Sequence, residues 1–96
     1  MENCLKIELK KLASKYHIGF KINDNSDRIL FVNNNYNINL KIFNKKANIF
    51  YEWKRGLLGR LFFKEEYNRL INLKKEILIL LEQNNFKTEE IIRNNI

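Results

Sequence analysis

Apolar residues alternate with polar ones through the middle of the chain, and this alternation constrains the fold more than any other feature. The clearest run spans residues 36–42, where Tyr36, Ile38, Leu40 and Ile42 are separated by Asn37, Asn39 and Lys41. A side-chain period of two is typical of a strand with one buried face. Further strand-like runs at residues 18–22, 29–32 and 49–53 are separated by Asn-, Asp- and Lys-rich turns. Strands joined by such short turns predict a four-stranded antiparallel meander.

Helical spacing replaces this alternation on both sides of the meander. A first helix is predicted from Leu5, Leu9, Leu12, Ala13 and Tyr16, and it ends near Gly19. The longest helix is predicted over residues 62–83, with Asn84-Asn85 at its end. Thr88 is expected to cap a final short helix with acidic residues in its first turn. We therefore predict one α+β domain over residues 1–96, a two-layer sandwich of order α-β-β-β-β-α-α.

The length and the single cysteine limit the class of protein. Ninety-six residues is the size of one domain. No run approaches the roughly 20 apolar residues of a membrane span, and the charged N-terminus is unlike a signal peptide. The lone Cys4 excludes an intramolecular disulfide and suits a reducing compartment. We expect a cytoplasmic protein, in the host cytoplasm if a phage encodes it, with no membrane partner.

Residue types that catalysis and metal binding require are scarce or badly spaced. Cys4 and His17 form the one conceivable nucleophile–base pair, yet they lie near opposite ends of the first helix, roughly 20 Å apart. The turn at residues 23–27 fails as a calcium loop because Arg28 and Ile29 would replace an oxygen ligand and a glycine. Phosphate loops and dinucleotide fingerprints are absent from the sequence. We predict a protein that is not an enzyme, with no catalytic residue, metal or cofactor.

Positive charge is concentrated in one quarter of the chain. The formal net charge is +7, and residues 41–64 carry seven Lys and Arg against Glu52 alone, a net +6. AT-rich coding favours lysine, asparagine and isoleucine, but such a bias would spread lysine evenly. This clustering therefore predicts a basic patch.

The segment from Trp53 to Lys64 is the most unusual stretch, because it combines two glycines, four cations and a dense set of apolar residues. Core closure is the favoured interpretation, in which Leu57, Leu58, Leu61 and Phe62 tuck under the sheet and the glycines permit a tight turn. Nucleic-acid binding is the second, with backbone N–H groups near phosphates and Tyr51 and Trp53 stacking on bases. A protein-binding loop is the third, with Leu57, Leu58 and Phe62 as exposed anchors and arginine at the rim.

The long helix carries more apolar surface than one stripe. Lys74 falls inside the apolar stripe, where its stem is expected to extend past the edge of the core. Leu73, Ile79 and Leu80 lie outside that stripe. This surplus must be covered by the last helix or by a homodimer through the surface at residues 73–81.

The order α-β-β-β-α with a basic glycine-containing turn before the last helix resembles the double-stranded-RNA-binding domain. That family needs a basic start to its final helix, whereas this chain reads Phe63-Lys64-Glu65-Glu66 and adds a fourth strand. These departures remove the phosphate-binding residues, so we do not assign the chain to the family.

Two functional hypotheses follow from the charge layout. The first is a small non-enzymatic binding protein whose basic surface, from residues 41–64 and the first helix, engages nucleic acid or a nucleoprotein complex. The alternative is a phage- or mobile-element-type inhibitor, anti-CRISPR-like or toxin-immunity-like, that acts by protein–protein contact. The candidate nucleic-acid- or partner-binding residues are Lys41, Lys45, Lys46, Trp53, Lys54, Arg55, Arg60 and Lys64.

Overall fold

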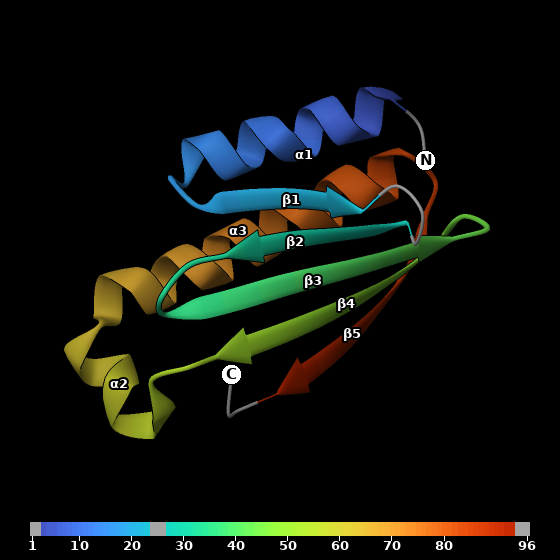
Figure 1. The fold of residues 1–96 in the computed structure, drawn as a ribbon. Coiled ribbons are helices and arrows are strands. Elements are labelled where there is room, and N and C mark those ends of the chain that lie inside the picture. Colours follow the sequence, from blue (N-terminus) through green and yellow to red (C-terminus); the bar gives the residue numbers. More distant parts are fainter. Residues whose placement is uncertain (1–2, 24–26, 94–96) are drawn as a thin grey trace.

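The computed structural model describes residues 3–23 and 27–93, and it confirms an α+β fold (Figure 1). In chain order its elements are α1 (Asn3–Lys15), β1 (Gly19–Asn23), β2 (Arg28–Val32), β3 (Tyr36–Phe43), β4 (Lys46–Trp53), α2 (Gly56–Phe62), α3 (Lys64–Gln83) and β5 (Lys87–Arg93). In this part of the chain, no helix combines the length and the apolar character needed to cross a membrane.

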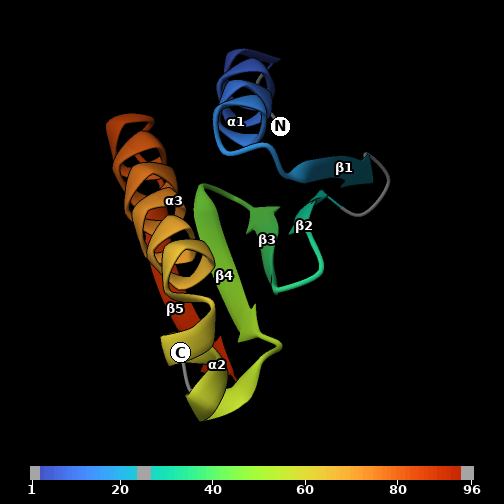
Figure 2. The same cartoon turned by 90° about the vertical axis from the view of Figure 1, so that its left-hand side faces the viewer.

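The five strands form one sheet in the order β1-β2-β3-β4-β5. The first four pair antiparallel, as the alternation predicts, and β5 pairs parallel with β4. Figures 1 and 2 show α1 and α3 packed on the same face of this sheet. The opposite face carries no described helix, so the predicted two-layer arrangement is confirmed.

Asparagine and lysine form the turns of the meander in different ways. Asn44 and Lys45 link β3 to β4, and both have positive φ, as in a type I′ hairpin turn. In the turn before β3, none of residues 33–35 has positive φ. Instead, the Asn33 side chain accepts hydrogen bonds from the backbone N–H groups of Asn35 and Tyr36 at 2.8 and 2.9 Å.

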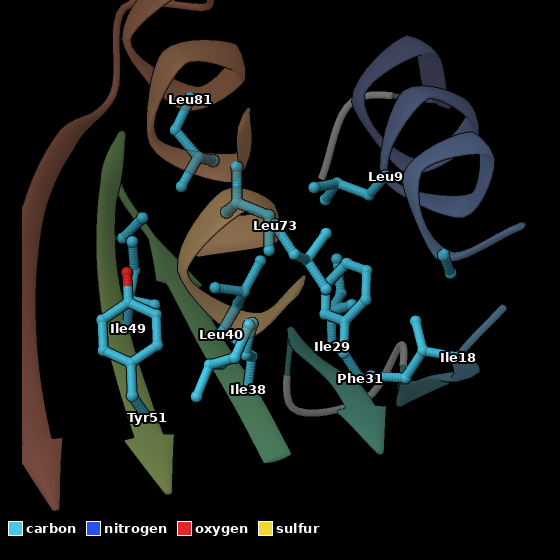
Figure 3. Close-up of a cluster of buried hydrophobic side chains, with 14 of the residues drawn as sticks. Leu9, Ile18, Ile29, Phe31, Ile38, Leu40, Ile49, Tyr51, Leu73 and Leu81 are labelled. Atoms are coloured by element: carbon cyan, nitrogen blue, oxygen red, sulfur yellow. The ribbon is translucent and has the colours of Figure 1, made fainter. Parts of the chain in front are cut away.

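The core lies between the sheet and the two long helices (Figure 3). Its strand residues are those of the alternation, and α1 and α3 contribute leucines and isoleucines at helical spacing. The fully buried residues include Leu9, Ile29, Phe31, Ile38, Leu40, Ile49, Tyr51, Leu73 and Leu81. The sequence pattern placed Leu73 outside the main stripe, but the side chain points into the centre of the core.

The expected short helix after Thr88 is wrong, because residues 87–93 form β5. Asn85 adopts a left-handed conformation with φ of 65° and reverses the chain at the end of α3. The backbone N–H of Phe86 then donates to Leu81 O at 3.0 Å, which completes a Schellman-type cap. The chain that follows runs beside the exposed edge of β4, where β-branched Thr88 and Ile91 suit a strand better than a helix.

This fifth strand also accounts for Lys74. The ammonium lies 3.9 Å from a carboxylate oxygen of Glu90 and 5.1 Å from the centre of the Tyr51 ring. The sheet edge therefore supplies a partner for a lysine that the sequence placed in an apolar stripe. Of the surplus apolar residues, Leu73 is buried within the chain and Leu80 is partly buried against the core, whereas Ile79 stays 53% exposed.

Candidate functional site

The sheet face that points away from α1 and α3, called the open face below, gathers positive charge from all five strands. Strand register fixes which side chains share it, because directly paired residues point to the same side. By register, the charged side chains on this face include the cations Lys21, Arg28, Lys41, Lys46 and Lys87 and the carboxylates Glu52 and Glu89. The open face is therefore basic.

Two pairs of like charges lie directly across strands on the open face. Arg28 on β2 is opposite Lys41 on β3, and Lys46 on β4 is opposite Lys87 on β5. Neighbouring strands are about 4.8 Å apart, so each pair repels, and opposed like charges destabilise a sheet. All four cations lie toward the end of the sheet that holds the β3–β4 turn.

Two phenylalanines lie among these cations. Phe43 ends β3 and is 66% exposed, and Phe50 on β4 is half-buried. One shallow depression of about 320 Å³ is lined by Arg28, Asn39, Lys41 and Phe50. A second, of about 370 Å³, is lined by Lys41, Phe43, Lys46 and Asn48. Lys41 belongs to both depressions, so they form one continuous surface with aromatic, amide and cationic side chains.

We call this surface the basic end of the open face, and define it by Arg28, Lys41, Phe43, Lys46, Phe50 and Lys87. The sequence indicated only Lys41 and Lys46 of these. Phe43 and Phe50 were missed because an apolar residue on the outer side of a strand looks like part of the core until the covering helices are known. Lys87 was missed because its segment was expected to be helical.

The candidate residues predicted from the sequence fall into two groups at opposite ends of the sheet. Lys41 and Lys46 lie at the basic end of the open face, and Lys45 lies in the adjacent turn with its ammonium 4.8 Å from the centre of the Phe86 ring. Lys54, Arg55, Arg60 and Lys64 lie around α2, beyond the other end of β4. The cations of α1 lie on the helical side of the sheet, so they form no single surface with Lys41 and Lys46.

Trp53 cannot stack on a base, because its side chain is 1% exposed. Its ring packs edge-on against Tyr67 at 5.3 Å, and its indole N–H donates to Gly56 O at 2.9 Å. Tyr51, the other aromatic residue proposed to stack, is fully buried, and this burial raises the pKa of its hydroxyl. Tyr51 and Trp53 are both buried because positions 49, 51 and 53 of β4 all point toward the helices.

Core closure by residues 57–62 is also wrong. Leu57, Leu58, Leu61 and Phe62 are between 63% and 79% exposed, and they lie on α2 rather than in a loop. The core is already closed by α1 and α3, so these side chains have no space beneath the sheet. The tight turn was predicted correctly, since Gly56 has φ of 69° at the start of α2.

An ion pair and a hydrogen bond join α1 to α3 through Glu76. Lys15 Nζ lies 2.6 Å from a carboxylate oxygen of Glu76, and the Tyr16 hydroxyl donates to the other oxygen. These hydrogen bonds, that of Lys15 first, hold the pKa of Glu76 below its usual value. Burial and the neighbouring carboxylate raise the pKa of Tyr16 to about 12. The contact links the two helices that cover the side of the sheet opposite the open face.

The residues considered for chemistry lie apart. Cys4 and His17 are both exposed, and His17 follows the end of α1 with φ of 52°. Residues 24–26 of the turn tested as a calcium loop lie outside the described residues. Within residues 3–23 and 27–93, no three His, Cys, Asp or Glu side chains gather in a way that could hold a metal ion.

No protein-family model, curated protein or solved structure matches this chain.

Proposed function

We propose that this protein binds single-stranded nucleic acid through the basic end of the open face. The observation that carries the proposal is the two like-charged cross-strand pairs, Arg28 with Lys41 and Lys46 with Lys87, placed around exposed Phe43 and half-buried Phe50. Each pair lowers the stability of the free sheet, and a bound anion would relieve both repulsions.

The spacing of the cations supports a polyanionic ligand. Four cations from four neighbouring strands form a band across the sheet, and each strand adds about 4.8 Å. Successive phosphates of one nucleic-acid strand can meet such a band in turn and release counterions. A compact anion would contact only one of the two pairs.

The aromatic and amide groups support a ligand with accessible base faces. Phe43 and Phe50 can each stack on a base, and stacking tolerates any base sequence. Asn39 and Asn48 line the same depressions, and an amide can both donate to and accept from a base edge. A duplex hides its base faces inside the stack, so this combination favours a single strand over a double strand.

Fluorescence anisotropy with labelled oligonucleotides of about 12 nucleotides tests the proposal. We expect the wild type to bind single-stranded DNA or RNA more tightly than the matching duplex, with affinity that falls as salt rises. The double variant Lys41→Gln/Lys46→Gln should reduce the slope of log affinity against log salt by about 1.4, since each phosphate contact contributes about 0.7 for single strands. Phe43→Ala should weaken binding about tenfold while changing this slope little.

A charge-matched control separates the site from the overall charge. Lys10→Gln/Lys75→Gln removes the same two charges from exposed positions on α1 and α3, and it should leave the salt slope unchanged. Equal loss in both double variants would show that net charge alone drives binding. Absence of binding to any oligonucleotide at low salt would reject the proposal and favour the alternative, a protein inhibitor that acts by protein–protein contact.

A further inference from the structure

Helix α2 is amphipathic, but its apolar side faces outward. At 100° per residue, Leu57, Leu58, Leu61 and Phe62 share one arc of the helix, and all four are well exposed. Gly59, on the opposite side, is the buried residue of this helix. Contiguous exposed apolar side chains of this size mark an interaction surface.

The fold holds α2 in this orientation. The indole N–H of Trp53 donates to Gly56 O in the first turn at 2.9 Å, and the Arg60 guanidinium lies 5.2 Å from the centre of the Tyr67 ring on α3. A Cβ added at Gly59 would lie 2.2 Å from the Cβ of Arg55 and 3.6 Å from Trp53 Nε1. The inner side of α2 is thus fitted to the domain through glycine, and the leucines and Phe62 are left to face solvent.

Four cations lie in α2 or next to it in the chain. Residues 53–64 contain Lys54, Arg55, Arg60 and Lys64 and no acidic residue. Arg55 is fixed by a 2.8 Å hydrogen bond to Asn35 Oδ1 and by the Phe63 ring 4.9 Å away. A second copy of the chain would oppose these cations with its own, so the charge argues against self-association through α2. An anionic partner is complementary to these cations.

We propose that α2 docks on the surface of an anionic lipid bilayer, with its four apolar side chains among the acyl chains and its cations at the headgroups. Leucine and phenylalanine on one side with lysine and arginine beside them is the composition of interfacial helices. The exposed arc offers no hydrogen-bonding side chain, whereas protein interfaces carry about one hydrogen bond per 100–200 Å². A bilayer needs no such directional contact.

This inference departs from the expectation of no membrane partner. The expectation of no membrane partner was based on the length of apolar runs. This length determines whether a helix can span a bilayer, but not whether an amphipathic helix can bind to its surface. Because α2 follows one end of β4 and the basic end lies toward the other end of that strand, docking does not depend on the proposed nucleic-acid binding.

Vesicle co-sedimentation tests the proposal. The wild type should sediment with vesicles of phosphatidylcholine and phosphatidylserine and stay in solution with phosphatidylcholine alone. Leu58→Ser/Phe62→Ser should reduce the partition coefficient at least about tenfold, without changing oligonucleotide affinity. Ile7→Ser/Ile79→Ser, the matched control at exposed positions on α1 and α3, should sediment like the wild type.

Three results would each overturn the proposal. The first is no sedimentation of the wild type with anionic vesicles at low salt. The second is sedimentation that the α2 variant retains, because the basic sheet alone would then explain it. The third is a wild-type dimer that the α2 variant converts to a monomer, since a second copy would then cover the apolar arc.

Discussion

Replacing Lys41 with glutamate should stabilise the fold and weaken nucleic-acid binding at the same time. Lys41 lies directly opposite Arg28 on the open face, so Lys41→Glu converts a repulsive cross-strand pair into an attractive one. Charged cross-strand pairs are worth about 0.2–1 kcal/mol in either direction. Since Lys41 is exposed, we expect a gain of about 0.5–1 kcal/mol at low salt. For a domain of this size, that gain raises Tm by roughly 2–8 °C.

Salt dependence distinguishes this mechanism from other causes of stabilisation. The screening length is about 10 Å at 0.1 M salt and about 3 Å at 1 M, compared with a strand spacing of about 4.8 Å. Thermal unfolding followed by circular dichroism should therefore show the gain at low salt and lose most of it at 1 M.

Lys75→Glu is the matched control, because it makes the same change of charge at an exposed position on α3. It should raise Tm much less and leave oligonucleotide affinity unchanged. A Lys41→Glu variant with unchanged or lower Tm at low salt, or with a gain that persists at 1 M salt, would refute the electrostatic reasoning.

Three further predictions concern the scaffold. Leu73→Ala should lower the free energy of unfolding by about 2–5 kcal/mol in urea titrations, because Leu73 is fully buried; a loss below 1 kcal/mol would contradict its place in the core. Gly59→Ala should lower the free energy of unfolding by about 1–2 kcal/mol despite the better helix propensity of alanine, since the added Cβ would lie 2.2 Å from that of Arg55. Unfolding followed by tryptophan fluorescence measures this loss, and a more stable variant would contradict the prediction. The pKa of Glu76 is lowered in the folded state, first by the hydrogen bond from Lys15. Ionised Glu76 therefore stabilises the fold at pH above the ordinary glutamate pKa, and this stabilisation is lost as pH falls through the lower folded value. Glu76→Gln should lower the free energy of unfolding by about 1 kcal/mol at pH 7 and should flatten the fall in stability between about pH 5 and pH 3.

The sequence predicted the meander well because each strand has a local signal. The alternation at residues 36–42 determines which side chains of β3 are buried, and Asn44-Lys45 supplies a two-residue turn with positive φ. The end of α3 was also predicted from a local signal, since Asn85 takes the left-handed conformation that ends the helix. The alternation does not determine which face of the sheet the helices cover, so it could not predict whether Trp53 is buried or exposed.

Two segments depended on partners far away in the chain. Residues 87–93 form a strand only because the edge of β4 is available to pair with them, and their acidic start mimics a helix cap. Residues 56–62 look like core because they are apolar, but α1 and α3 fill the core first. The basic end of the open face likewise needs strand register to bring Arg28, Lys41, Lys46 and Lys87 together.

Mapping a single-stranded oligonucleotide onto the protein by amide chemical-shift perturbation tests the central claim most directly. Titration of the ¹⁵N-labelled chain should shift the amides of Arg28, residues 39–50 and Lys87, and should leave those of α1 and α2 in place. Larger shifts in α1 or α2, or none at low salt, would contradict nucleic-acid binding through the basic end of the open face.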